Sequence, residues 1–442
     1  MEAQGSTTAS TLVSVTGSGS AVDETQPAAG HRRYPIYLHV VVMAIVGGLA
    51  VLAWLLVFDA GEKILWGNAF VAANPWVFPF ICMPFSLIVG LLVRYRQAPT
   101  NVHGSAMDSL MSDPSAIDWR HLPVTIVTPL ASLFSGAVLG PEGGIGGIAS
   151  QLAAWYNDAL KVPAEGRARL VFSAVASAYN GLIANPLFTG VLGTELIKDK
   201  AVGAATLPSN LIGGAIGFLI FTAVGYPGLG NYLHLQPTPG IQLADVLVIA
   251  PLALLGIVLA LVAGVFFRVA AAAFGRFDDQ VIVRALIGGA IFSVVGVFAP
   301  IVMFSGETEV QTLVADPASY GAATLLLMAV VKLALLAVAF KSGFFGGPTF
   351  PAIFASVSVA LAIGLLFPAA RLDVLIAGVM AGCLTVFFKA PFMVILLTAF
   401  MLQAGVDLVA LIVLAVATVL IVQPFLLDLI AARRAARSGG TG

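Results

Sequence analysis

Charged residues are scarce in this chain. Asp, Glu, Lys and Arg make up 10% of its 442 residues, against about 25% in a soluble domain. Hydrophobic residues make up 59%, and the mean hydropathy is +1.01. So few charges cannot cover a water-exposed surface, and we predict an integral membrane protein. The net charge of -1 also leaves no basic surface for nucleic acid.

Residues that could build a metal site or a catalytic pair are also few. Cys82 and Cys383 are the only cysteines and lie in apolar runs without ligand spacing, so they predict neither a disulfide nor a metal site. An enzyme inside the membrane would need a nucleophile and a base, or metal ligands, at depth. We therefore do not expect an enzyme, because most histidines lie outside the long apolar stretches, at positions 31, 103, 121 and 234.

Long apolar stretches are what the chain has instead. A helix needs about 20 apolar residues to cross the bilayer core. Such stretches occur at residues 36–58, 70–93, 211–225, 246–267, 285–304, 322–340 and 408–427. They predict several membrane crossings and an all-α polytopic protein.

Shorter apolar pieces, interrupted by glycine and proline, lie between these stretches. They are too short or too interrupted for ordinary spans and occupy residues 145–156, 187–197, 350–367 and 392–402. Irregular backbone at membrane depth is tolerated only where protein buries it or where it lines an aqueous cavity. Transporters usually bind their substrates at such broken helices. The pattern indicates a transporter or a channel.

Arginines flank the apolar region at both ends, at positions 32, 33, 433, 434 and 437. By the positive-inside rule both termini lie in the cytoplasm, and the number of crossings is even. Residues 1–30 are rich in Ser, Thr, Gly and Ala, which is typical of a disordered tail and not of a signal peptide, and we expect a disordered cytoplasmic tail over residues 1–34. We expect a multi-pass transport domain over residues 35–430 in the plasma membrane, followed by a cytoplasmic tail over residues 431–442.

The two halves of this domain share an arrangement that predicts a duplication over residues 70–230 and 245–430. Each half has a Gly-rich break that opens a short helix, then an Ala-rich helix, then a second break with proline. The landmarks are 205 residues apart (347 minus 142 and 391 minus 186). The breaks are Gly140-Pro141-Glu142-Gly143-Gly144 and Ala184-Asn185-Pro186-Leu187 in the first half, and Gly346-Gly347-Pro348-Thr349 and Lys389-Ala390-Pro391-Phe392 in the second. Repeated halves place a substrate site near the midplane, where half-helix termini meet.

The first break has the composition of an anion-receiving helix N-terminus. Pro141 suits the first helical turn, and Gly140, Gly143 and Gly144 let backbone N–H groups face a cavity without side-chain obstruction. Such a terminus offers unpaired donors and about half a positive charge. It favours an anion without the strong hold of a full Lys or Arg charge, so the ion can leave.

Glu142 stands inside this break, where an ionisable side chain costs about 2.5–3.5 kcal/mol on membrane insertion scales. One interpretation is that its carboxylate occupies the anion site and leaves when it is protonated or displaced. Glu142 would then be both gate and proton carrier. The other interpretation is that Glu142 caps its own helix, as acidic residues do in first turns. The two roles are compatible.

The matching break offers Gly347, Thr349 and Phe350 to the ion from the opposite side, through backbone amides or the Thr349 hydroxyl. Its alternative interpretation is a glycine-rich loop with two prolines. Together the two breaks form the predicted anion site.

Other charged residues give less specific signals. Glu195 is either a solvated helix end or a proton relay. Lys332 either draws anions toward the pathway or extends its ammonium to the membrane interface. Charges within a membrane are functional by default, which adds Lys389 and Asp407 as candidates. The pair at positions 307 and 309 is typical of an exposed loop or a helix start.

These motifs, in this order and spacing over residues 35–430, resemble the CLC chloride channel and transporter family. The segments that carry the likeness are Gly136 to Gly147, Asn185-Pro186-Leu187 and Ser342 to Pro351. The resemblance implies two inverted repeats of tilted, broken and re-entrant helices. It also implies a homodimer with one independent anion pathway in each subunit, and no cofactor. Glu142 matches the family's gating glutamate.

The chain departs from the family pattern at several ion-contacting positions. Asn101 is the nearest equivalent of the anion-contacting serine, and Thr349 replaces a phenylalanine of the second break, where Pro348 also removes one amide. Leu196 replaces the glutamate that serves internal proton transfer in family exchangers. The last tyrosine is Tyr320, so the pore-lining tyrosine near the final helix is missing.

We therefore predict transport of a small inorganic anion, with chloride as the expected ion, gated by Glu142. The protein would be either a channel or an H+/Cl- exchanger. One alternative is a fluoride-exporting CLC-type transporter, whose branch also lacks the serine and the tyrosine but has an acidic residue where Pro348 stands here. Another is a carrier of a small organic anion. The expected partners are the anion, protons, the lipid bilayer and a second copy of the chain.

Overall fold

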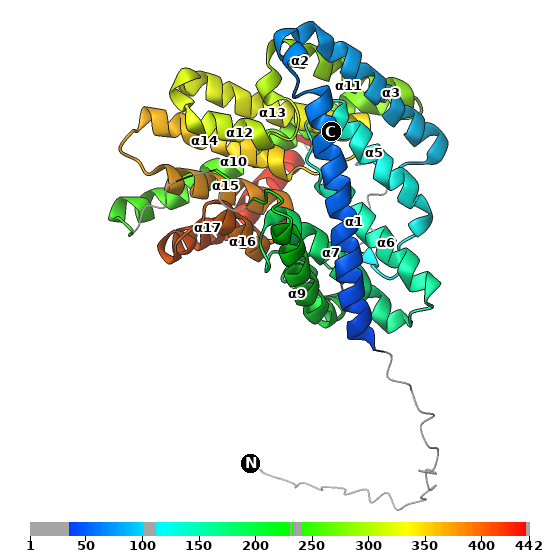
Figure 1. Cartoon of the computed structure of the whole chain (residues 1–442). Helices are drawn as coiled ribbons and strands as arrows, with labels where there is room; N and C mark the ends of the chain where they lie inside the picture. The colour runs from blue at the N-terminus through cyan, green and yellow to red at the C-terminus, as the bar shows by residue number, and fades with distance from the viewer. Residues whose placement is uncertain are drawn as a thin grey trace, which may run out of the picture. The chain divides into compact units, whose positions relative to one another are not determined.

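The computed structural model describes residues 35–100, 112–197, 199–229, 232–233, 235 and 240–438. Over these ranges the chain consists of α-helices and short 3-10 helices (Figure 1). The helices of the first half are α1 (Ile36–Leu65), α2 (Ala69–Ala73), η1 (Pro75–Val77), α3 (Phe78–Arg96), η2 (Trp119–His121), α5 (Leu122–Phe134), α6 (Glu142–Ala159), α7 (Ala164–Ile183), α8 (Leu192–Leu196) and α9 (Lys200–Ala223).

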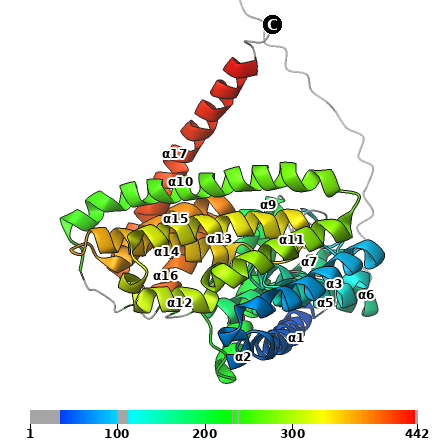
Figure 2. The ribbon, with the colours of Figure 1, turned by 90° about the horizontal axis from the view of Figure 1, so that it is seen from above.

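The second half begins with the long helix α10 and ends with α17, whose last turns project beyond the other helices in Figure 2. Its helices are α10 (Leu243–Phe274), η3 (Gly275–Phe277), α11 (Val281–Phe298), η4 (Pro300–Val302), α12 (Glu307–Ala315), η5 (Pro317–Ser319), α13 (Ala322–Ser342), α14 (Thr349–Leu366), α15 (Leu372–Phe388), α16 (Pro391–Met401) and α17 (Val406–Ser438).

Eight of the described helices are long and apolar enough to cross a membrane, namely α1, α3, α9, α10, α11, α13, α14 and α17. The predicted stretches 36–58, 246–267, 322–340 and 408–427 fall within α1, α10, α13 and α17. The stretch 211–225 corresponds to α9, which begins earlier, at Lys200. The all-α polytopic fold predicted from the sequence is therefore confirmed.

Two predicted spans are shorter than expected because proline ends the helix. The stretch 70–93 is interrupted at Asn74 (φ -132°, ψ 75°), and Pro75 opens η1 before α3 begins. The stretch 285–304 ends in the same way at Ala299 (φ -146°, ψ 65°), before Pro300. Proline has no N–H to donate and excludes the residue before it from the helical region.

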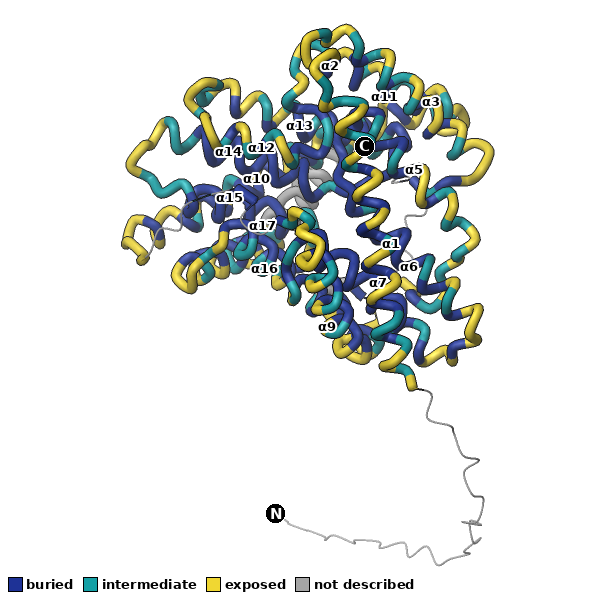
Figure 3. Tube along the Cα trace, viewed as in Figure 1, coloured by how far each residue is buried: buried dark blue, intermediate teal, exposed yellow. Residues whose placement is uncertain are grey.

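The stretch 350–367, predicted to be too short or interrupted, forms the unbroken 18-residue helix α14. Pro351 falls in its first turn, where no intrahelical hydrogen bond is lost. What distinguishes α14 is burial: 78% of its apolar window is buried, against 28–50% in the other candidate spans. Figure 3 shows this buried centre, which also includes much of α7 and α15.

The other stretches predicted to be too short or interrupted form helices of different lengths. The stretch 145–156 lies within α6, and 392–402 corresponds to α16, which has only 11 residues. The stretch 187–197 begins with turns, and its helical part is the five-residue α8. Pro186 and the turns that follow it leave no room for a longer helix.

Contacts near the two ends of α1 identify the two sides of the domain. Where α1 begins, His39 Nδ1 and Tyr156 OH of α6 are 2.7 Å apart, and we call this side the near face. Where α1 ends, the Trp66 ring packs against those of Phe78 and Phe304 at centroid distances of 4.8 and 5.0 Å, and we call this side the far face. From its first residue, α6 therefore runs toward the near face.

Helix α14 runs in the opposite direction. The Lys332 ammonium lies 4.6 Å from the ring centroid of Phe354, in the second turn of α14. The same ammonium donates a 3.0 Å hydrogen bond to the carbonyl of Phe304, on the far face. α6 and α14 thus leave the middle of the domain toward opposite faces, as inverted repeats require.

The register between the repeats differs from the predicted one at the Gly-rich breaks. Both helices have 18 residues and begin directly after a Gly-Pro pair, at Glu142 and Thr349, which are 207 residues apart (349 minus 142). The predicted pairing of Glu142 with Gly347 is wrong. The breaks at Pro186 and Pro391 keep the predicted separation of 205 residues (391 minus 186). The two-residue difference falls in the intervening segments, where weak identity between the halves hides it.

Candidate functional site

The N-termini of α6 and α14 meet in a short antiparallel bridge. The Gly140 amide donates to the Gly347 carbonyl at 2.8 Å, and the Gly347 amide donates to the Gly140 carbonyl at 2.8 Å. This reciprocal pair fixes the two helix starts against each other at the centre of the inverted repeat. Because both amides are engaged in the bridge, these glycines can shape the site but do not point their N–H groups at an ion.

The carboxylate of Glu142 lies in the space that these two glycines leave. A Cβ atom at either Gly140 or Gly347 would overlap Glu142 Oε2. Glu142 is 5% exposed and is the first residue of α6. The absence of side chains at both glycines therefore makes room for the carboxylate between the two helix N-termini.

The first turn of α14 supplies hydrogen bonds to this carboxylate. Its Oε1 accepts from the amide of Phe350, in the first turn of α14, at 3.3 Å. The side chain and the amide of Thr349 also donate hydrogen bonds to the carboxylate. Oε2 has no hydrogen-bond partner in the described part of the chain. Leaving a buried charged oxygen unpaired is costly. The carboxylate therefore reaches across to the opposite repeat, where Thr349 and Phe350 at the start of α14 are its partners.

Neighbouring side chains hold the backbone around the carboxylate in place. The Tyr179 hydroxyl of α7 donates to the carbonyl of Glu142 at 2.7 Å. On the other break, the amide of Phe345 donates to Ser132 Oγ of α5 at 3.0 Å. Buried partners of this kind set the direction of each break. Gly146, one turn from Glu142, leaves room for the Tyr179 hydroxyl, 2.7 Å from where its Cβ would lie.

The glycines that follow Glu142 serve packing. A Cβ at Gly143 would lie 3.0 Å from the backbone of Gly346, and one at Gly144 would lie 2.9 Å from Pro129 and 3.0 Å from the Trp54 ring. Close approach of neighbouring helices thus requires small residues at both positions. The amides of Glu142, Gly143 and Gly144 belong to the first turn, which a helix cannot satisfy internally.

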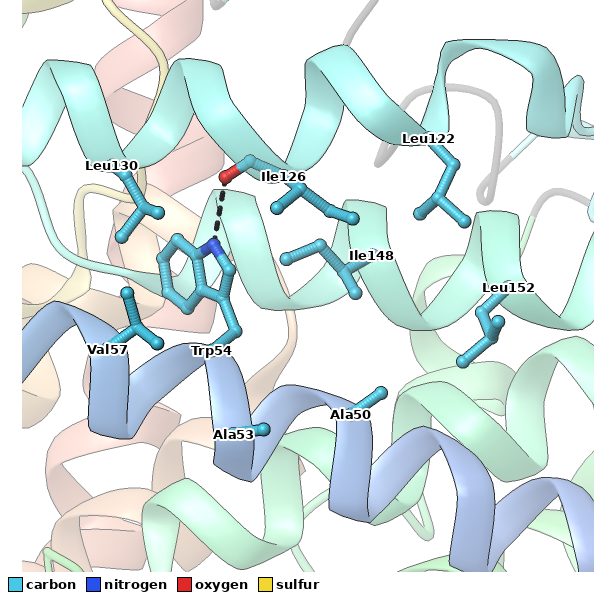
Figure 4. Close-up of a pocket in the computed structure, with 9 residues that line it drawn as sticks. All are labelled: Ala50, Ala53, Trp54, Val57, Leu122, Ile126, Leu130, Ile148 and Leu152. Carbon is cyan, nitrogen blue, oxygen red and sulfur yellow. Dashed lines mark hydrogen bonds between the residues drawn. The ribbon is translucent and has the colours of Figure 1, made fainter.

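A pocket of about 300 Å³ lies on the outer side of α6, between α1 and α5 (Figure 4). Its one polar ring group, Trp54 Nε1, already donates to the Ile126 carbonyl at 2.9 Å. The remaining lining is aliphatic and offers nothing to an anion. The lining residues are Ala50, Ala53, Trp54, Val57, Leu122, Ile126, Leu130, Ile148 and Leu152.

Acidic residues gather on the far-face side of Glu142. Glu307 begins α12, and its carbonyl accepts from the hydroxyl of Tyr232, whose ring lies 6.4 Å from that of Phe350. Burial, followed by the negative charges of Glu62 and Glu142, raises the pKa of Glu307 to about 8. The predicted helix start at this position is confirmed, but the residue is partly buried.

Lys332 is fully buried, and its predicted extension to the membrane interface is wrong. Its ammonium donates to the carbonyls of Met303 at 2.7 Å and Phe304 at 3.0 Å. These carbonyls satisfy the charge inside the protein, together with the ring of Phe354. Lys332 thereby ties the segment before α12 to α13 and α14.

Glu195 binds a helix N-terminus in the other half of the chain. Its carboxylate accepts from the amides of Phe392 at 2.8 Å and Met393 at 3.0 Å, at the start of α16. This contact is a cap and not a solvated end. Lys389 and Asp407 are exposed at helix ends, so they are not buried charges.

Of the predicted ion-contacting residues, Glu142, Thr349 and Phe350 lie together, and Asn101 lies outside the described residues. The sequence analysis did not identify Tyr179 or Ser132. Neither residue belongs to a local motif, and both have other buried polar residues near them in sequence. Only their long-range contacts with the breaks show their importance.

Sequence and fold comparisons identify the family of the chain. The chain matches the sequence profile of the family described as voltage gated chloride channel over residues 85–423. It is 27% identical over 337 residues to the putative ion-transport protein YfeO of Escherichia coli and of Shigella boydii, covering 73% of this chain and 78% of each relative.

Two solved structures share the fold. The chain is similar to a slow cyanobacterial Cl-/H+ antiporter, with a TM-score of 0.74 and 18% identity over 88% of this chain and 94% of the other. It is also similar to a CLC-type fluoride/proton antiporter, with a TM-score of 0.67 and 17% identity over 87% of this chain and 94% of the other. The profile match covers most of the membrane domain. The chain therefore belongs to the voltage gated chloride channel family.

Proposed function

We propose that this protein transports small inorganic anions, with chloride as the expected ion, and that Glu142 gates their path. Membership of a family of ion channels and transporters supports anion transport and not an enzymatic activity. One observation carries the role of Glu142: its buried carboxylate occupies the space between Gly140 and Gly347, where the N-termini of two inverted helices converge.

The gate follows from what the carboxylate occupies. Two helix N-termini favour negative charge, and in the described structure the carboxylate of Glu142 supplies it. An anion from solution competes for the same donors, among them the Phe350 amide. Protonation removes the charge that holds the carboxylate there. Either event frees the position for a permeating ion.

The positive-inside rule assigns the near face to the cytoplasm, because α1 begins there after Arg32 and Arg33. The acidic residues on the far-face side of Glu142 then lie on the outer side of the membrane. We further propose a homodimer in the plasma membrane, with one anion path in each subunit. Protons are the second substrate if Glu142 carries them across as it moves.

The proposal is tested by reconstituting the protein in vesicles loaded with chloride and recording chloride efflux and proton uptake together. The native chain and Glu142→Gln are compared. A neutral amide cannot be held as an anion between the helix termini, so the variant should conduct chloride without dependence on pH. Stoichiometric proton uptake in the native chain would identify an exchanger, and its absence a channel.

Glu165→Gln is the matched control, because Glu165 is an exposed acid in the first turn of α7. It should behave like the native chain. Fluoride efflux, measured alongside, distinguishes a fluoride exporter from a chloride transporter. Efflux of a series of larger organic anions distinguishes an organic-anion carrier from both. Native protein that moves no small inorganic anion would contradict the proposal.

A further inference from the structure

Arg284 is the fourth residue of α11 and is one of the largest fully buried side chains, with 1% exposure. Near its other end α11 packs against the far face, because a Cβ at Gly296 would overlap the Phe78 ring. Arg284 therefore lies toward the near face. No feature of the sequence motifs accounts for a full positive charge buried at this position.

The guanidinium uses only part of its hydrogen-bonding capacity. Its Nη1 lies 3.1 Å from Oδ1 of Asp278, whose side chain is 65% exposed. Nε and Nη2 have no hydrogen-bond partner among the residues that the structure describes. Nε–H and Nη2–H form one edge of the planar fork, the edge that binds anions with two parallel bonds. An uncompensated buried donor of this kind is costly.

This unpaired edge faces the chain that leads to the second break. A Cβ at Gly343, the residue after α13, would lie 3.4 Å from Arg284 Nη2 and 3.6 Å from Nε. Gly343 has φ +96°, which favours glycine. One turn along α11, a Cβ at Gly288 would be 2.8 Å from the Phe344 ring. Arg284 thus stands beside residues 342–344, just before the bridge at Gly347.

We propose that Arg284 binds a small inorganic anion, a halide, on the near side of the Glu142 site. This inference rests on the proposed anion transport. It adds an anion position formed by a side chain to the Glu142 site, which is formed by backbone amides. Burial limits the occupant to a small ion. Asp278 offsets part of the guanidinium charge, which keeps binding weak enough for the ion to move on.

The direct test is diffraction from crystals of the native chain soaked in bromide, recorded at the bromine absorption edge. We expect an anomalous peak within hydrogen-bond distance of Arg284 Nε and Nη2. Crystals in which bromide occupies the Glu142 region but not this edge would overturn the inference. This readout does not depend on transport, so it stands even if the proposed function fails.

The functional test compares the chloride concentration that gives half-maximal efflux in vesicles. Arg284→Gln should raise this concentration by about tenfold or more, since a hydrogen bond to a charged group contributes about 1.5–3 kcal/mol. Asp278→Asn should lower it several-fold, because it removes the competing carboxylate. Arg276→Gln, at an exposed arginine in η3, should leave it unchanged.

A purely structural salt bridge predicts a different pattern. Arg284→Gln and Asp278→Asn would then both lower the thermal unfolding temperature and would shift the half-maximal concentration in the same direction or not at all. Either result overturns the proposal while leaving anion transport by the native chain intact. If Arg284→Gln does not fold, two other results test the proposal. They are the lower half-maximal concentration expected for Asp278→Asn and the bromide peak at Arg284.

Discussion

At the scale of single residues, Gly347 decides where the Glu142 carboxylate can sit. A Cβ there would overlap Oε2, so Gly347→Ala should expel the carboxylate from between the helix termini. Loss of a hydrogen bond to a charged group is worth about 1.5–3 kcal/mol, which predicts a rise of roughly tenfold or more in chloride efflux at neutral pH. Chloride efflux from vesicles, recorded over a range of pH, measures this rise.

The control for this substitution is Gly264→Ala in α10, where an added Cβ meets no atom within 4 Å. It should leave both the efflux and its pH dependence as in the native chain. If Gly347→Ala retained native efflux with an unchanged pH dependence, the carboxylate would not gate from this position.

Glu307 predicts a pH dependence of stability. Burial, followed by the charges of Glu62 and Glu142, raises its pKa from 4.5 to about 8 in the folded protein. The folded state therefore binds this proton more tightly than the unfolded state. The corresponding stability is fully present below about pH 4.5 and is lost as the pH rises through about 8. Thermal unfolding temperatures in detergent should fall between pH 5 and 8.5.

The variant Glu307→Gln cannot ionise, so it should show a smaller fall in unfolding temperature over this pH range. Glu165→Gln, an exposed acid, should reproduce the native fall. If the unfolding temperature fell equally with pH in the native chain and in Glu307→Gln, folding would not raise the pKa of Glu307.

At the scale of helices, Glu195 joins the two halves by capping α16 from α8. The residue before α16, Ala390, offers no side-chain cap, and Glu195 supplies both acceptors instead. Glu195→Ala should lower the free energy of unfolding by about 1–2 kcal/mol, as the loss of an N-cap does. Glu165→Ala serves as control. Amide hydrogen exchange should accelerate at Phe392 and Met393, and unchanged protection there would exclude the cap.

The helices also show what a single sequence can and cannot predict. Apolar length predicted α1, α10, α13 and α17, because a membrane span depends on local composition. The interruptions at Pro75 and Pro300 follow from proline chemistry but are hidden inside apolar stretches. The composition of the Gly-Pro breaks predicted two converging helix N-termini.

The contacts of the site were not predictable in the same way. Glu142 accepts from Phe350, which is 208 residues away, and the Arg284 guanidinium approaches Gly343 only in the fold. Neither pair has a local pattern, because each partner is an ordinary residue of its own helix. The separation of 207 residues between the starts of α6 and α14 was likewise not predictable, since it depends on which helix starts face each other.

At the scale of the whole molecule, the described residues of the proposed site all come from one chain. Glu142, Phe350 and the bridge between Gly140 and Gly347 all come from the same polypeptide, and so does Arg284. A homodimer should therefore contain two paths that work independently. Linking one native subunit to one Glu142→Gln subunit tests this, because each path should keep the pH response of its own chain. Efflux should equal the mean of the two uniform dimers at every pH, whereas a shared gate would give the response of one parent alone.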